Sequence, residues 1–149
     1  HPMAAGLSLP TENIDLFRAK LNRQQTLTEK ELTPVTWIDV PMPVSYASKK
    51  LVEQLRVLEP FGKGNEKPVF ADRKLTVRSA NMIGKNKNVL KMQLEDTQGH
   101  VVDAIQFKVE EEDMPLRGKE ISIVYYPDIN EFRGNQTLQF IVQEWCYTT

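Results

Sequence analysis

The stretch VFADRKLTVRSANMIGKNKNVLKMQLEDTQGHVVDAIQF, residues 69–107, decides the fold. Val, Ile, Leu and Thr are frequent in three runs of this stretch, as they are in β-strands. The segments between the runs, 84–87 and 97–99, contain Gly, Asn and Thr, which favour tight turns. The pattern predicts strands over residues 69–83, 88–95 and 101–107.

Two more runs of strand-forming residues follow, at 120–126 and 137–146, with a predicted helix at 109–114 and a predicted loop at 127–136. Five short strands with a long first strand and a helix in the third connection are the pattern of a small Greek-key barrel of the OB type. An SH3-like barrel is the competing fold, and it would not need the helical insert.

The residues before this stretch predict short helices and little sheet. Pro10 and Thr11 open a predicted helix over 11–24, with Thr11 as its N-cap, and Leu7-Ser8-Leu9 alternates like a strand. Thr28 and Glu31 form a capping-box pattern, flanked by Leu27 and Leu32 as a hydrophobic staple. A short strand is expected over 35–40, and a third helix over 45–58 with an apolar stripe made of Leu51, Leu55 and Leu58.

A domain boundary is expected at residues 59–68, where two Gly and two Pro in ten residues exclude a helix. The chain begins with His1 in what reads as the middle of a domain, and we therefore expect it to be a piece of a longer protein. The expected class is α+β: a partial α/β domain over 1–44, a connecting helix and linker over 45–67, and a five-stranded barrel over 68–149.

Composition excludes several classes of protein. The 149 residues are 40% hydrophobic and 26% charged, with a net charge of −1, so the chain as a whole carries no electrostatic preference for nucleic acid or membrane. No apolar run approaches the roughly 20 residues that span a bilayer, and no signal peptide is visible, so we expect a cytoplasmic protein without membrane contact. One cysteine, Cys146, excludes an internal disulfide and a Cys/His zinc site.

The charges are nevertheless unevenly distributed along the sequence. Residues 63–91 hold eight basic and two acidic side chains, whereas residues 95–120 hold eight acidic and three basic ones. The barrel is therefore expected to have a basic and an acidic flank. The acidic run at 110–113 is not a metal site, because consecutive helical residues point in different directions. No nucleophile triad, phosphate-binding loop or dinucleotide motif is present.

In an OB barrel, strands 2 and 3 and the loops joining strands 1 to 2 and 4 to 5 form the ligand face. Strand 2 places polar residues opposite Leu90, Met92 and Leu94, so its polar side can approach a ligand. Phe132 is placed to stack on a base, and the basic residues to contact phosphate. The candidate nucleic-acid-binding residues are Arg78, Lys85, Lys87, Lys91, Gln93, Phe132 and Arg133.

Two segments resemble a known family. His1-Pro2-Met3-Ala4-Ala5-Gly6-Leu7 is similar to the end of the Gly-Gly-His-x-x-Ala-Ala-Gly motif of the DHH-associated domain, although both leading glycines are absent here. Residues 58–70, LEPFGKGNEKPVF, are similar to the segment that leads into the OB domain of RecJ exonucleases, members of the DHH phosphoesterase superfamily. The resemblance covers nearly the whole chain.

This resemblance implies a 5′-to-3′ exonuclease that acts on single-stranded DNA in repair and recombination. It implies Mn or Mg held by a catalytic DHH domain elsewhere in the parent chain, and no cofactor, catalytic residue or nuclease activity in the present chain. The partners expected are single-stranded DNA, the DHH domain, and a single-strand-binding protein or helicase. Within the first motif, His1, Ala5 and Gly6 are expected to approach a phosphate.

Two other functional classes remain open at this point. The first is a protein-interaction barrel that docks a replication or repair partner through its acidic flank or its hydrophobic pockets. The second is an autonomous enzyme, which the absence of a carboxylate cluster disfavours.

Overall fold

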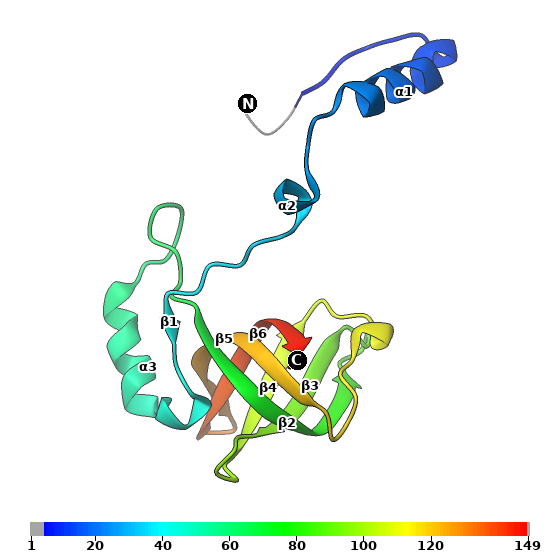
Figure 1. Cartoon of the computed structure of the whole chain (residues 1–149). Coiled ribbons are helices and arrows are strands. Elements are labelled where there is room, and N and C mark those ends of the chain that lie inside the picture. Colours follow the sequence, from blue (N-terminus) through cyan, green and yellow to red (C-terminus); the bar gives the residue numbers. More distant parts are fainter. Residues whose placement is uncertain (1–4, 149) are drawn as a thin grey trace. The chain divides into compact units, whose positions relative to one another are not determined.

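The computed structural model describes residues 5–148 and divides the chain into two compact units, with the division between Thr36 and Trp37 (Figure 1). In the first unit, the helix predicted over 11–24 is confirmed as a 3₁₀ turn, Thr11–Asn13, followed by α1, Ile14–Gln24. Thr11 is not its N-cap, because the turn begins directly after Pro10 and makes no side-chain capping bond. Residues 7–9 form no strand, because none of the described strands pairs with them.

The predicted capping box is confirmed at α2, Glu29–Leu32. The Thr28 N–H donates to Glu31 Oε2 at 2.9 Å, and the Glu31 N–H donates to Thr28 Oγ1 at 3.4 Å. The predicted staple does not form a core, because both Leu27 and Leu32 are more than half exposed.

Five strands of the second unit close into a barrel. Hydrogen bonding runs from β2 to β3 to β4, then in parallel from β4 to β6, then to β5 and from β5 back to β2. This is the predicted five-stranded Greek-key order of an OB barrel. The strands are β2 Phe70–Ile83, β3 Val89–Glu95, β4 Val101–Phe107, β5 Glu120–Phe132 and β6 Asn135–Tyr147.

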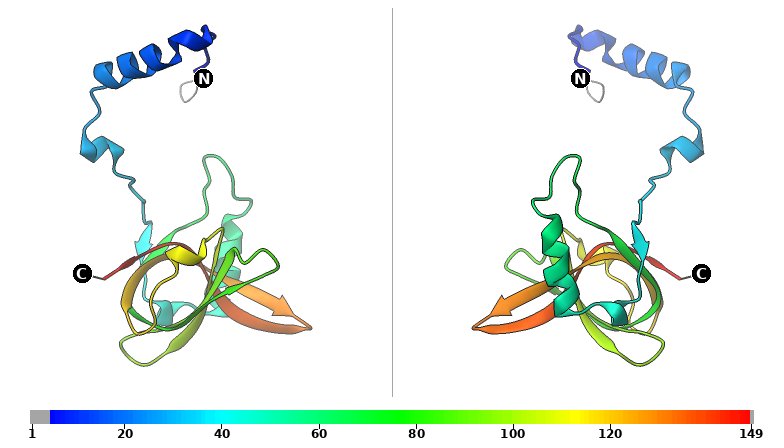
Figure 2. Two further views of the ribbon diagram at one scale, coloured as in Figure 1. Left: turned by 90° about the vertical axis from the view of Figure 1, so that its right-hand side faces the viewer. Right: turned by 90° about the vertical axis from the view of Figure 1, so that its left-hand side faces the viewer.

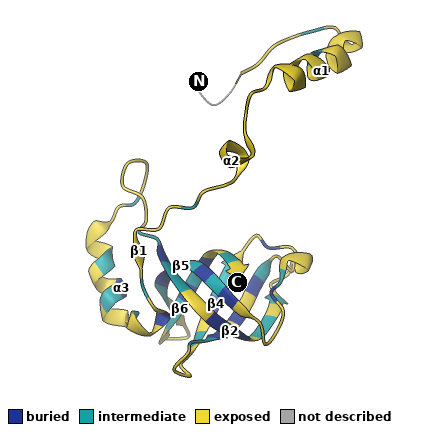
Figure 3. Cartoon of the chain, in the orientation of Figure 1, coloured by how far each residue is buried: buried dark blue, intermediate teal, exposed yellow. Residues whose placement is uncertain are grey.

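The predicted alternation of β3 is confirmed. Leu90, Met92 and Leu94 are completely buried, while Lys91 and Gln93 between them are exposed. The same alternation lines the barrel interior on the other strands (Figure 3). The largest of the other fully buried side chains are Tyr125, Phe140, Leu75, Ile121 and Ile123.

Two predictions for the second half of the barrel are wrong. Residues 127–136 are not a loop: β5 and β6 continue as a hairpin, which Figure 2 shows in orange extending from the barrel. Its turn consists of Arg133 and Gly134, with φ of 51° and 79°. Positive φ at both positions matches the right-handed twist of the strands, so they stay paired to the tip. The predicted helix at 109–114 is only a 3₁₀ turn, Glu111–Asp113.

The residues expected to form a linker pack on the barrel. The 3₁₀ turn Val44–Tyr46, α3 Lys49–Leu55 and the 3₁₀ turn Arg56–Leu58 replace the predicted helix over 45–58. Val52, rather than the predicted leucine stripe, is the buried residue of α3; Leu55 is partly buried against the core and Leu58 is 47% exposed. Packing therefore joins this segment to the barrel, and the units divide at 36/37 instead of within 59–68.

Backbone contacts hold the same segment in place. The strand predicted over 35–40 is reduced to β1, Val40–Pro41, which pairs in parallel with the start of β2. The Tyr125 hydroxyl donates to the Met42 carbonyl at 2.8 Å, and the Val44 N–H donates to Asp72 Oδ2 at 2.8 Å. Burial is the largest cause that raises the pKa of Tyr125, so this phenol remains a donor.

We expect Val52→Ala to lower the free energy of unfolding by about 2 kcal/mol, because it removes two fully buried methyl groups. Val57→Ala is the matched control: Val57 is 85% exposed, and its replacement should change stability by less than about 0.5 kcal/mol. Denaturant unfolding measures both. Equal effects would contradict the packing of α3 on the barrel.

Candidate nucleic-acid interface

The outer face of β3 is flanked on both sides by paired strands. Lys91 lies between Asn81 of β2 and Ile105 of β4. Gln93, two residues further, lies between Ser79 and Asp103 in the same way. Because side chains on one face repeat every second residue, these six positions form two adjacent rows across three strands. We call the outer surface of β3 and β4 the β3–β4 face.

The two loops predicted to bind nucleic acid lie at opposite ends of this face. Val89, next to the β2–β3 turn, pairs with Phe107 at the end of β4. β6 runs parallel to β4 with Ala104 opposite Phe140, so the start of β6 and the hairpin tip lie toward the other end of β4. β4 has seven residues and is therefore about 20 Å long, enough for several nucleotides in a site of the size that OB folds use.

The β2–β3 turn exposes two lysines. The Lys87 N–H donates to the Gly84 carbonyl at 3.2 Å, and Gly84 has φ 86° and Lys87 φ 46°. Glycine adopts this left-handed conformation without strain, which explains its position at the start of the turn. Lys85 and Lys87 are both exposed in this turn at one end of the face, and Lys91 follows them in β3.

The tip of the β5–β6 hairpin carries an exposed aromatic ring beside a cation. Phe132 is 64% exposed, and the guanidinium carbon of Arg133 lies 5.1 Å from the centre of its ring. The pair presents a flat surface and a positive charge together, which suits contact with a base and a neighbouring phosphate.

Arg78 differs from the other candidates because it is already paired. Its guanidinium contacts the Glu95 carboxylate on the neighbouring strand, and the hydrogen bond and charge of Glu95 raise the pKa of Arg78. The basic residues of 63–91 also do not form a single patch. The Lys67 ammonium instead lies 3.9 Å from the centre of the ring of Tyr126, a residue of β5.

Sequence reasoning missed two residues of this face. Phe107 is 55% exposed at the end of β4, beside Val89 and the lysine-bearing turn. Asp103, next to Gln93, places a negative charge in the middle of the face. The alternation of β4, with Ala104 buried between Asp103 and Ile105, would have assigned both residues to the outer face.

The remaining candidates belong to the start of the chain. Ala5 and Gly6 are exposed residues without regular secondary structure in the first unit, and the β3–β4 face is built without them. His1 lies outside the described residues. Within residues 5–148, no three His, Cys, Asp or Glu side chains are placed to hold a metal ion, so the described residues do not fit the Mn or Mg implied by the resemblance.

The closed barrel, the parallel β4–β6 pairing and the partly apolar β3–β4 face define an OB-fold domain. In the described part of the chain, no helix is both long and apolar enough to cross a membrane. The chain belongs to the RecJ OB domain family, whose sequence model matches residues 38–144. The match begins close to the division between the two compact units.

Bacterial proteins named single-stranded-DNA-specific exonuclease RecJ are similar over nearly the whole chain. The protein of Haemophilus influenzae is 36% identical over 95% of this chain, and that of Bacillus subtilis 31% identical over 97%. The chain spans only 25% and 19% of the lengths of these two relatives.

Solved structures of RecJ from Thermus thermophilus share the fold. The complex with Mn²⁺ superimposes with a TM-score of 0.65 at 16% identity, covering 96% of this chain and 20% of that protein. The complex with Mg²⁺ gives a TM-score of 0.62 at 17% identity, covering 95% of this chain and 21% of that protein.

We expect Phe107→Ser to leave the free energy of unfolding within about 0.5 kcal/mol of the parent, because the ring is mostly exposed and contributes little to the core. Phe140→Ala should instead cost about 3–5 kcal/mol, since Phe140 is 1% exposed inside the barrel. Thermal and denaturant unfolding compare the two. A large loss of stability with Phe107→Ser would give the ring a structural role.

Proposed function

We propose that this domain binds single-stranded DNA along the β3–β4 face, between the β2–β3 turn and the β5–β6 hairpin. The observation that carries the proposal is the pair of exposed aromatic rings, Phe107 and Phe132, on a domain of the RecJ OB family. Unpaired bases can stack on such rings whatever their sequence, because every base has a π face.

Lysines supply the complementary contacts in this proposal. Lys85, Lys87 and Lys91 lie at the Phe107 end of the face and attract phosphates, while Arg133 does so at the hairpin tip. Gln93 donates to a base edge or a phosphate between them. Asp103 repels the backbone locally, so the strand should pass with its bases, rather than its phosphates, over that position.

We further propose that the parent protein is a single-strand-specific 5′-to-3′ exonuclease of DNA repair and recombination in the bacterial cytoplasm. The names of the relatives support this, and the Mn²⁺ and Mg²⁺ complexes support a metal-dependent hydrolysis. Metal binding and hydrolysis belong to a catalytic DHH domain, and the present residues hold and deliver the strand. The residues before Trp37, including His1, Ala5 and Gly6, then contribute a phosphate-contacting edge of a DHH-associated domain.

We expect Phe107→Ala and Phe132→Ala each to weaken binding of a fluorescent oligo-dT by about 1–3 kcal/mol, the usual value of one base–aromatic stack. Trp37→Ala is the matched aromatic control. Trp37 is 85% exposed, but it lies just before β1, which pairs with the start of β2, whereas the lysine-bearing turn follows the other end of that strand. Fluorescence anisotropy at constant salt measures all three. If both phenylalanine variants bind with the affinity of the unsubstituted chain, the DNA strand must bind elsewhere.

The double variant Lys85→Ala/Lys87→Ala should lower the magnitude of the log–log salt slope of binding by roughly 0.7 for each phosphate that the protein no longer neutralises. It should weaken dT and mixed sequences alike, since phosphates carry no base identity. Titrations at several salt concentrations give the slope. If the affinity of the unsubstituted chain hardly responds to salt, the protein-interaction barrel becomes the better interpretation.

A further inference from the structure

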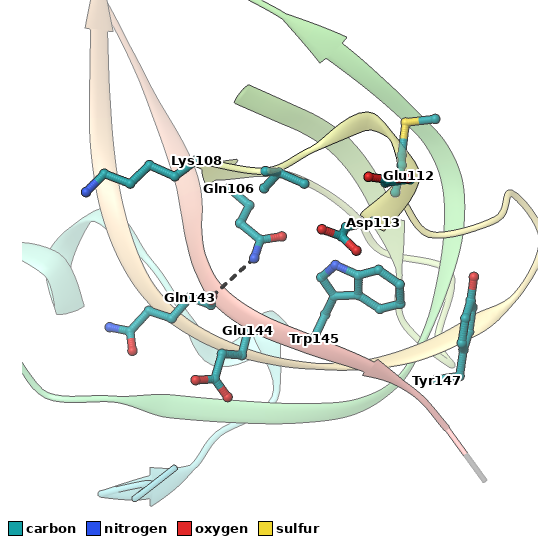
Figure 4. Close-up of a pocket in the computed structure, with 10 residues that line it drawn as sticks. Gln106, Lys108, Glu112, Asp113, Gln143, Glu144, Trp145 and Tyr147 are labelled. Carbon is teal, nitrogen blue, oxygen red and sulfur yellow. Dashed lines mark hydrogen bonds between the residues drawn. The ribbon is translucent and has the colours of Figure 1, made fainter. Parts of the chain in front are cut away.

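A concave site lies behind the end of β4, on the side opposite to Phe107. It is a pocket of about 510 Å³ formed by the end of β4, the 3₁₀ turn Glu111–Asp113 and the end of β6 (Figure 4). Gln106 and Phe107 are neighbours in β4, so Gln106 faces the pocket side while Phe107 faces the proposed DNA site. The two sites are therefore separate.

The pocket contains an unsatisfied hydrogen-bond acceptor. Gln106 Nε2 donates to the Gln143 carbonyl at 3.1 Å, which fixes the orientation of the amide. Gln106 Oε1 is buried and has no hydrogen-bond partner among the described residues. Figure 4 shows this oxygen turned away from Gln143, toward the part of the pocket where Asp113 and Trp145 lie. A buried acceptor without a partner is costly, so a ligand that donates to it gains binding energy.

The surroundings of this oxygen favour a cation. Glu112 and Asp113 bring two carboxylates to the rim, and the half-buried indole of Trp145 forms an aromatic wall. Lys108 also borders the pocket, but Figure 4 shows its amine extending away from Glu112 and Asp113. An acidic site with an aromatic wall attracts a positive group and repels a phosphate backbone.

We infer that this pocket binds an arginine side chain of a partner protein. A guanidinium is planar, stacks on an aromatic ring, and has five N–H donors in fixed directions. With its flat face on Trp145 it can donate to the carboxylates of Glu112 or Asp113, and it reaches the buried Gln106 Oε1 once the groups that cover this oxygen move aside. A lysine ammonium offers one compact point of charge and cannot satisfy these groups together as well.

The test uses the 149-residue chain and the peptide acetyl-Gly-Arg-Gly-amide as the probe. Nitrogen-edited NMR follows the side-chain amide of Gln106 and the indole N–H of Trp145 during titration. We expect both signals to shift with the arginine peptide. The citrulline peptide, which has the same shape without the charge, should bind at least about tenfold more weakly, because it lacks the positive charge that pairs with the carboxylates and has fewer N–H donors.

Two matched double variants separate the pocket from general acidity. Glu112→Gln/Asp113→Asn should weaken the arginine peptide by about tenfold, whereas Glu110→Gln/Glu111→Gln, which removes the same charge beside the pocket, should change affinity less than about twofold. Gln106→Met, which keeps the size but removes the acceptor, should also weaken binding. Unchanged β-sheet amide shifts in each variant verify the fold.

Several results would overturn the inference. Equal binding of the arginine and citrulline peptides would remove the role of charge, and equal weakening in the two double variants would leave only general attraction to an acidic surface. A dT trinucleotide that shifts the Trp145 indole signal and competes with the peptide would show a nucleotide pocket instead.

Discussion

The bend of β2 is the constraint on which the barrel depends. This strand pairs with β5 through its first half and with β3 through its second half, and irregularities at Asp72–Leu75 and Val77–Ser79 let it turn between them. Bulges increase local twist and allow a sheet to close. Lys74, with φ 62°, lies within the first irregularity. Without this bend β5 could not return to β2, and the β3–β4 face would belong to an open sheet.

The alternation of side chains then gives β4 two sides of different chemistry. Because side chains alternate, Phe107 points to the outer face beside the basic turn, and Gln106 points to the acidic pocket. Lys85, Lys87 and Lys91 lie near the first site, and Glu112 and Asp113 near the second. A domain with net charge near zero can in this way present surfaces suited to ligands of opposite charge.

The segment from Trp37 to Leu58 is a structural part of the OB domain. Val44 and Val52 are buried, Met42 accepts a hydrogen bond from the Tyr125 hydroxyl, and β1 pairs with β2. Such contacts tie the residues before the barrel to its core, so they are expected to fold with it. The family match, residues 38–144, includes this segment from its second residue onward.

The sequence by itself determined the strands over 69–107, the buried alternation of Leu90, Met92 and Leu94, and the capping box at Thr28, because each depends on neighbours only a few residues away. Tertiary structure decided the rest. The exception is the hairpin at 127–136, whose pairing is local but whose turn requires a positive φ at Arg133, a conformation that the sequence does not reveal because it is uncommon for a residue other than glycine. The partners of Arg78 and Lys67 and the unpaired Gln106 oxygen arise where different strands and loops meet, and no local pattern specifies such contacts.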